Sequence, residues 1–218
     1  MMEQDNLADR VAPRSALKQE RSRQRQQALL DAAEEMIAEA GLDGLSMREV
    51  GRRAGLPIAS VYHYFPSAPA MVRELATRQL ARLGALVEHR LFTGKELVKS
   101  NIGIQSLAGH IVSDLAAYLA EAKAAPAIWN ALRSNPELRL LDRADTIENA
   151  RNLAPFLTAL DPGVSGQVAE ALAIVILETV AINLMFAMEC SEPQQGAQLA
   201  ALRLFLSAAI RGLAQGEA

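Results

Sequence analysis

Two short helical segments joined by a tight turn, residues 46–54 and 58–64, restrict the fold of this chain more than any other feature of its sequence. Gly55 is expected to end the first segment, since glycine is strongly favoured just past a helix end. Ser46 and Glu49 are spaced as in a capping box, in which each side chain bonds to the other residue's backbone N–H. The pattern therefore predicts two short helices rather than one long helix.

Apolar residues in both segments are spaced to face a common core. Val50 and Ala54 lie four residues apart, as do Val61 and Phe65, and residues at this spacing share one face of a helix. The other residues of 58–64 then point outward. A helix-turn-helix has this layout, and its second helix lies in the DNA major groove. An ordinary helical hairpin with a solvated basic face is the alternative interpretation.

Residues 24–75 resemble the DNA-binding domain of the TetR family of bacterial transcriptional regulators. The matching positions are Gly41, Leu45, Ser46, Arg48, Val50, Ala54, Gly55, Leu56, Val61, Tyr62, Tyr64, Phe65, Pro66 and Ser67. Ala59 stands where the family usually has glycine, and Ala68 where it commonly has a lysine that contacts a DNA phosphate. The resemblance implies an all-α fold, in which an N-terminal three-helix helix-turn-helix DNA-binding domain is followed by a larger helical ligand-binding and dimerisation domain.

The chain is expected to have three parts: a flexible basic N-terminal arm at 1–21, the DNA-binding domain at 22–67, and the effector-binding and dimerisation domain at 68–218. Alanine and leucine are abundant and only 4% of residues are aromatic, which favours helices over sheet. Apolar spacing predicts helices at 22–40, 46–54, 58–64, 69–91, 104–124, 126–134, 136–160, 165–190 and 194–214, with a loop at 93–103.

The distribution of charge suits DNA binding, although the formal net charge is −3. Between Arg10 and Arg25 there are six basic residues and one acid, and phosphate attraction depends on the local field. For residues 1–15 a solubilising tail is the alternative interpretation. The residues expected to contact DNA are Lys18, Arg21, Arg23, Arg25, Ser46, Arg48, Ile58, Ala59, Ser60, Tyr62, His63 and Tyr64.

In the last expected helix, apolar residues of 199–213 recur at three- and four-residue steps. Residues 168–188 of the helix before it are apolar on more than one face, so that helix must be buried on several sides. The TetR resemblance implies that this pair forms a four-helix bundle between two copies of the chain. The residues expected at the dimer interface are Leu202, Phe205, Leu206 and Ile210. The alternative is that both helices only complete the core of a single chain.

The region between the DNA-binding domain and this helix pair is the expected sensor. Its apolar faces are interrupted by isolated polar residues, as in small-molecule pockets. The residues expected to bind ligand are His110, Asp114, Tyr118, Trp129, Phe156, Glu178 and Asn183. Tyr118 and Trp129 are more often core residues than ligand contacts, and that alternative stays open.

No pattern for catalysis or metal binding is visible in the sequence. The three histidines have no metal-ligand spacing, and Cys190 is the only cysteine, which excludes an intrachain disulfide. There is no apolar signal sequence, and the apolar run at 171–177 ends at Glu178, short of a membrane span. We therefore expect a cytoplasmic protein with no enzymatic activity, cofactor, metal site or membrane association.

Together these patterns predict a homodimeric transcriptional regulator that responds to a ligand. We expect a repressor that releases a palindromic double-stranded DNA operator when a small, largely apolar effector binds the C-terminal domain. The alternative is a TetR-like helical scaffold that acts as a ligand-binding or protein-interaction module without specific DNA binding. Binding to a palindromic duplex distinguishes the two.

Overall fold

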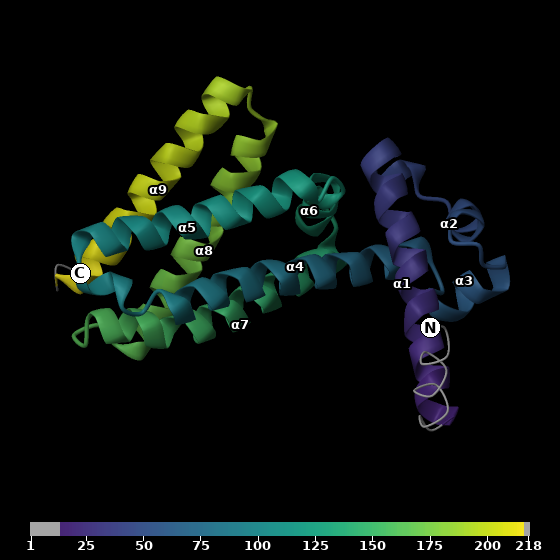
Figure 1. Ribbon diagram of the computed structural model, residues 1–218, viewed down its shortest axis with the longest axis horizontal. Coiled ribbons are helices and arrows are strands. Elements are labelled where there is room, and N and C mark those ends of the chain that lie inside the picture. The colour runs from purple at the N-terminus through teal and green to yellow at the C-terminus, as the bar shows by residue number, and fades with distance from the viewer. Residues whose placement is uncertain (1–13, 216–218) are drawn as a thin grey trace, which may run out of the picture. The chain divides into compact units, whose positions relative to one another are not determined.

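The computed structural model describes residues 14–215, and this part of the chain is helical without any strand (Figure 1). The all-α prediction is therefore confirmed for the described residues. The elements are α1 (Arg14–Ala40), η2 (Leu42–Gly44), α2 (Met47–Arg53), α3 (Ile58–Tyr64), α4 (Ala68–Thr93), η3 (Leu97–Lys99), α5 (Asn101–Glu121), α6 (Ala125–Ser134), α7 (Pro136–Leu160), α8 (Gly166–Glu189) and α9 (Glu192–Ala214). The chain forms two compact units, which divide between Leu75 and Ala76, within α4.

The first unit packs α1, α2, α3 and the first two turns of α4 around one apolar core. Its buried side chains recur at three- and four-residue steps, which places them on one face of each helix. They are Leu29, Leu30, Ala33, Met36, Ile37, Met47, Val50, Val61, Phe65, Met71, Val72 and Leu75. This core fixes the orientation of α3, whose remaining residues face outward.

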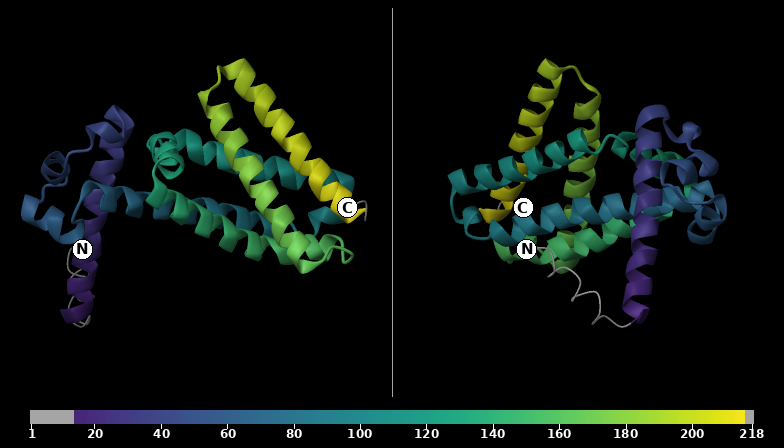
Figure 2. Two further views of the ribbon diagram at one scale, coloured as in Figure 1. Left: turned by 180° about the vertical axis from the view of Figure 1, so that it is seen from behind. Right: turned by 45° about the vertical axis from the view of Figure 1, so that its right-hand side comes forward.

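The second unit contains the rest of α4 and helices α5 to α9. Helix α7 packs along α8, and α9 packs against both α5 and α8. Figure 2 shows α8 and α9 as a hairpin whose turn lies near Ser191, with α5 alongside it. The core includes Leu107, Ile111, Leu115, Leu153, Leu157, Ile176, Val180 and Leu184. These helices surround the cavity described below.

Several helix boundaries differ from the sequence prediction by one to three residues, and the start of α1 differs by eight. Residues 14–21, predicted to belong to a flexible arm, are part of α1. The reason is that no glycine or proline interrupts the sequence between Arg14 and Ala40, so nothing ends the helix before residue 22. The predicted loop at 93–103 is shorter than expected, because η3 occupies its centre and α5 already begins at Asn101. Residues 1–13 of the predicted arm lie outside the described residues.

Candidate DNA-binding surface and ligand pocket

The turn between α2 and α3 holds the two helices in close contact. Gly55 has a φ of 66°, a left-handed conformation that favours glycine, and Leu56 N donates to Gly51 O at 2.9 Å. A Cβ on Gly51 would lie 2.9 Å from Val61 Cγ2, so glycine permits this approach of the two helices. Val50 and Val61 are completely buried beside it. The helix-turn-helix geometry thus rests on two glycines and an apolar contact.

The predicted capping box at the start of α2 is wrong. Ser46 is the N-cap residue, but its side chain makes no capping hydrogen bond. The Glu49 carboxylate accepts hydrogen bonds instead from Arg52 at 2.8 Å and 2.5 Å and from Arg53 at 3.2 Å. The hydrogen bond from Arg52 is the main reason that the pKa of Glu49 falls to about 2. An arginine pair offers Glu49 stronger, charge-assisted bonds than a backbone N–H does.

These ion pairs neutralise Arg52 and Arg53 on the outer side of α2. Arg53 also donates to the Glu39 carboxylate at 3.0 Å and 2.7 Å, so both of its sides are engaged. Arg48, one helical turn away on α2, is exposed and has no ion pair among the described residues. It is therefore the arginine of α2 that is available to a DNA phosphate or base.

Helix α3 presents a mixed apolar and polar outer face. Tyr62 is 52% exposed and Ile58 is 43% exposed, and their spacing of four residues places both on one face of the helix. His63 and Ala59 are exposed beside them, whereas Ser60 is half-buried. An aromatic hydroxyl, an imidazole and small apolar groups on one helix are the side chains that can contact phosphates, base edges and thymine methyls.

Tyr64 is held in a defined position at the end of α3. Its hydroxyl lies 3.1 Å from Ser22 Oγ of α1, and its ring meets His63 edge-to-face at a centroid distance of 5.2 Å. The contact joins α3 to the basic N-terminal half of α1. There, Lys18, Arg21 and Arg25 are exposed without an ion pair among the described residues, and Arg23 lies 3.8 Å from Glu20. The predicted basic residues thus lie on a helix rather than on a flexible arm.

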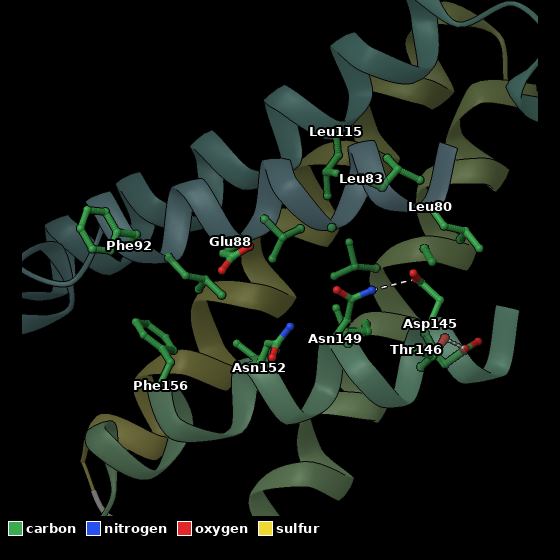
Figure 3. Close-up of a pocket in the computed structure, with 18 of the residues that line it drawn as sticks. Leu80, Leu83, Glu88, Phe92, Leu115, Asp145, Thr146, Asn149, Asn152 and Phe156 are labelled. Atoms are coloured by element: carbon green, nitrogen blue, oxygen red, sulfur yellow. Dashed lines mark hydrogen bonds between the residues drawn. The ribbon is translucent and has the colours of Figure 1, made fainter. Parts of the chain in front are cut away.

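A cavity of about 760 Å³ lies in the second unit, between α4, α5, α6, α7 and α8. Its wall is mainly apolar, and Figure 3 shows Leu80, Leu83 and Leu115 along it, with Phe92 and Phe156 at one end. Volume and lining are typical of small-molecule sites, which are mostly apolar with a few placed polar groups. This cavity is the candidate ligand pocket.

The polar groups of the pocket come mainly from α7 and are absent from the list of residues expected to bind ligand. Asp142, Asp145, Asn149 and Asn152 line it together with Thr146. Asn149 Nδ2 donates to Asp145 at 2.7 Å, and Thr146 Oγ1 donates to Glu178 at 3.2 Å, as the dashed lines in Figure 3 show. Steps of three and four residues between these positions place them on one face of α7. That spacing was the signal in the sequence that could have revealed them.

Burial raises the pKa of both aspartates above the ordinary value of 3.8. For Asp142 desolvation is the larger cause and the negative charge of Glu178 adds to it, against the opposing effect of Arg133. For Asp145 desolvation is again the larger cause, with Asp142 next, and the hydrogen bond from Asn149 opposes the shift. The pocket thus holds two carboxyl groups whose ionised forms are disfavoured by their surroundings.

Three of the seven residues expected to bind ligand line the pocket: Trp129, Phe156 and Glu178. Trp129 is also largely buried, so it belongs both to the core and to the pocket wall. The other four are outside the lining: His110, Asp114, Tyr118 and Asn183. His110 is exposed, Asp114 forms an ion pair with Arg90, and Asn183 bonds to Gln198 at 2.8 Å. The apolar faces of their helices were recognised, but polar side chains on them can equally bond to neighbouring helices.

The residues expected at the dimer interface are mostly inside the single chain. Leu202, Leu206 and Ile210 are buried in its own core, and only Phe205 is appreciably exposed, at 40%. These three leucine and isoleucine side chains therefore cannot also cover a partner. Large apolar side chains that remain exposed on α8 and α9 are Val168, Val175, Ile182, Phe186 and Leu204.

Comparison with known proteins agrees with the geometry of the first unit. The family model for bacterial regulatory proteins of the tetR family matches residues 29–75, which run from α1 to α4. A protein from Mesorhizobium loti assigned to the TetR family shares the fold over 88% of this chain and 96% of its own, with a TM-score of 0.66 and 20% identity. Residues 29–75 of this chain are thus similar to the tetR family of bacterial regulatory proteins.

Two relatives align with this chain in sequence. The HTH-type transcriptional repressor KstR of Mycolicibacterium smegmatis is 29% identical over 84 residues, which are 38% of this chain and 41% of KstR. The HTH-type transcriptional regulator BetI of Burkholderia thailandensis is 27% identical over 149 residues, 68% of this chain and 75% of BetI. The alignment with KstR thus covers about two-fifths of that protein.

Two departures from the TetR pattern have simple structural settings. Ala59 is an exposed residue of α3, where alanine is compatible with a helix. Ala68 is the first residue of α4, and the Ser67 hydroxyl beside it accepts a hydrogen bond from Ala70 N at 3.3 Å. The start of α4 is thus stabilised, but it lacks the lysine that is common at this position of the TetR pattern.

The apolar character of α8 and α9 is greater than expected. Both helices are long and apolar enough to cross a membrane by length and composition, although core helices of soluble proteins pass the same test. In the most apolar stretch of each, 28% of the residues are buried within the chain. Part of the remaining apolar surface is formed by the large apolar side chains that are exposed on α8 and α9.

Proposed function

We propose that this chain is a ligand-responsive DNA-binding regulator of the TetR family, a repressor that releases a palindromic operator when a small molecule occupies the pocket of its second unit. The observation that carries the proposal is the outer face of α3, where Ile58, Tyr62 and His63 are exposed on a rigid helix-turn-helix. No internal contact explains large apolar and aromatic groups there, whereas entry into a DNA major groove does.

Each predicted DNA contact has a role in this proposal. Ile58 and Ala59 contact thymine methyl groups, while Ser60 and His63 reach base edges or phosphates. Tyr62 and Tyr64 bond to phosphates through their hydroxyls, and Ser46 lies at the α2 terminus where a phosphate can approach. Lys18, Arg21, Arg23 and Arg25 on α1, with Arg48 on α2, supply the positive charge that attracts the DNA backbone.

The homodimer is proposed to form through α8 and α9, but by faces other than those expected from the sequence. Val168, Val175, Ile182 and Phe186 follow a spacing of seven, seven and four residues and make one exposed stripe along α8. Exposed Leu204 lies on α9, the neighbour of α8. Two-fold pairing of these surfaces would bury the stripe and present two copies of α3 to a palindrome.

The effector is proposed to bind in the cavity beside α4. That helix supplies buried residues to the first unit, such as Met71 and Leu75, and pocket-lining residues to the second, such as Leu83 and Val87. A ligand acts on DNA affinity only if it prefers one of two conformations, and a preference of about 1–3 kcal/mol is typical of such coupling. We propose that the conformation preferred with ligand spaces the α3 helices wrongly for the operator.

Regulators of the TetR family are generally non-enzymatic, and we propose no reaction for this chain. KstR and BetI, named a repressor and a regulator of the helix-turn-helix type, support a regulatory role in the cytoplasm, where the DNA is. The alternative of a ligand-binding or protein-interaction scaffold without DNA binding has no observation in its favour.

Selection from a random pool of DNA duplexes tests the proposal. The purified protein should enrich a sequence with two inverted half-sites, and a duplex with a single half-site should bind far more weakly. Enrichment of no sequence, at a salt concentration that permits protein–DNA binding, would overturn the proposal and favour the scaffold alternative.

A matched pair of arginine variants then tests the surface. Arg48→Ala and Arg52→Ala remove the same charge from exposed positions of α2, but Arg52 is already paired with Glu49. Arg48→Ala should weaken operator binding and reduce the slope of log affinity against log salt by about 0.9, the value for one phosphate contact. Arg52→Ala should leave that slope nearly unchanged. Equal slopes for both variants would remove Arg48 from the contact surface.

A further inference from the structure

We infer that the pocket of the second unit selects an amphiphilic organic cation, whose positive group lies against Asp142 and Asp145 and whose apolar part extends toward Phe92 and Phe156. This inference names the ligand class for the effector site, so its regulatory meaning rests on the proposed function. The cavity is the site, and the charge and position of its polar groups determine what it accepts.

The pocket is polar at one end and apolar at the other. Figure 3 shows Asp145, Thr146 and Asn149 toward one end, and Phe92 with Phe156 toward the opposite end. Between them Figure 3 shows Glu88 of α4 and Asn152 of α7, and leucine and valine side chains from α4, α5 and α8 complete the wall. A ligand that fills about 760 Å³ of such space must be largely apolar, because an unpaired polar group there would lose its bonds to water.

The charge inside the polar end is negative. Asp142 has no hydrogen bond or ion pair among the described residues, and Asp145 accepts a hydrogen bond only from the neutral amide of Asn149. The nearest cation, Arg133, bonds to Glu178 at 3.2 Å and lies over the ring of Trp129. Its charge is therefore already shared with another carboxylate, and the two aspartates keep an unmatched negative charge.

The basic residues that line the pocket do not offset this charge. Lys95 and Lys99 are exposed residues near the Phe92 end. Lys99 forms an ion pair with Glu96, and Lys95 Nζ lies 5.4 Å from the centroid of the Phe92 ring. Exposed charges are screened by water and salt, whereas the half-buried aspartates are screened much less. An anionic ligand group would therefore be repelled beside the two aspartates.

An organic cation suits this site better than a metal ion does. Among residues 14–215 no group of three or more histidine, cysteine, aspartate and glutamate side chains is placed to hold a metal ion. The raised pKa values of Asp142 and Asp145 show that their negative charge is poorly compensated in the empty chain. An ammonium group would supply the missing counter-charge, and its alkyl part would occupy the apolar end.

Three eight-carbon compounds that differ in the head group test the inference: octylammonium, 1-octanol and octanoate. Trp129 is the only tryptophan of the chain and lies in the pocket wall, so its fluorescence reports binding without a label. Octylammonium should bind at least tenfold more tightly than octanol and octanoate at pH 7.5, with isothermal titration calorimetry as the second measurement. Weaker or equal binding of octylammonium, or no saturable binding, would overturn the inference.

Paired double variants locate the selectivity. Asp142→Asn with Asp145→Asn should reduce octylammonium affinity to that of octanol and leave octanol binding unchanged. Glu121→Gln with Glu170→Gln removes the same charge from exposed positions outside the pocket and should keep the preference. Retained preference in the aspartate variant, with both proteins folded by circular dichroism, would show that these carboxyl groups do not select the ligand.

The role in regulation is measured separately. Octylammonium at saturating concentration should lower the affinity of the protein for its selected operator. Cation-selective binding without any change in operator affinity would retain the ligand class and reject the effector role. Operator release by octanoate rather than octylammonium would support the effector role and overturn the inferred ligand class.

Discussion

The position of a side chain on α8 or α9 should decide whether a new charge breaks the dimer or the fold. Ile182 is 49% exposed in the single chain, whereas Leu206 is 4% exposed. We therefore expect Ile182→Glu to be a folded monomer and Leu206→Glu to lose its fold. Both variants carry the same added charge, so they differ only in where the carboxylate lies.

The loss of dimerisation free energy in Ile182→Glu can be estimated from the exposed half of the Ile182 side chain. Full burial of an isoleucine side chain stabilises by about 1.5–3 kcal/mol, so covering the remaining half contributes about 1 kcal/mol in each chain. A two-fold dimer contains the position twice, and each buried, unpaired carboxylate adds a penalty of about 2 kcal/mol or more. The dimer should then be weakened by about 6 kcal/mol, more than a thousandfold in the dissociation constant.

The substitution of Leu206 should lower the free energy of unfolding of the single chain. Replacing a buried leucine by glutamate removes about 2–3 kcal/mol of apolar burial and places a charge in the core at a cost of several kcal/mol more. Domains are stable by only about 5–15 kcal/mol, so the second unit should unfold or expose its core.

Sedimentation over a range of protein concentrations, with thermal unfolding by circular dichroism, separates these outcomes. Gln167→Glu is the control, because it adds the same charge at an exposed position of α8 beside the stripe of large apolar residues. It should remain a dimer. An Ile182→Glu protein that sediments as a dimer at all concentrations would refute the proposed interface, and a folded Leu206→Glu protein would refute its place in the core.

Three further outcomes follow from individual contacts. Tyr62→Phe should weaken operator binding by about 1 kcal/mol, the value of one hydrogen bond, without changing the melting temperature. Asp142→Asn should raise the melting temperature at pH 7.5, because the raised pKa of Asp142 in the folded chain means that its ionisation costs stability. Well below pH 3.8 the variant should have no such advantage, because the carboxyl group is then protonated in both the folded and the unfolded state. In Gly84→Ala the new Cβ would lie 2.9 Å from Asn149 Oδ1, so the Asn149 side chain must move. This displacement should weaken octylammonium binding, measured by Trp129 fluorescence.

The sequence predicted the helices well wherever a helix boundary has its own chemistry. Helix α7 runs from Pro136 to Leu160 as predicted, because proline fixes its first turn and the Asn135 side chain caps it by accepting from Glu137 N at 2.9 Å. At the start of α1 the predicted boundary was eight residues late, at 22 instead of 14. Pro13 directly precedes Arg14 and was the boundary signal that the prediction did not use.

The face of a helix that covers a partner could not be predicted when every face is apolar. On α9, Leu202 and Leu206 are buried in the chain, whereas Leu204, between them, is 70% exposed. All three are leucines, so composition gives no distinction, and only the positions of α5 and α8 decide which side is covered. The polar residues of the pocket could not be predicted for a different reason. Its key polar residues lie on α7, among other charged positions that resemble an ordinary solvated helix face.

The two aspartates of the pocket connect stability with ligand binding in a way that a single experiment can follow. Their raised pKa values mean that the folded chain carries an electrostatic cost at neutral pH. A cation beside them would reduce this cost only in the folded state, so it should raise the melting temperature; at 100 times its dissociation constant the gain is about 2.7 kcal/mol. The Asp142→Asn and Asp145→Asn double variant does not have this electrostatic cost, even without ligand. That protein should therefore melt higher without ligand and gain less from octylammonium than the wild-type chain does. A larger gain in the variant would show that the cation is recognised elsewhere.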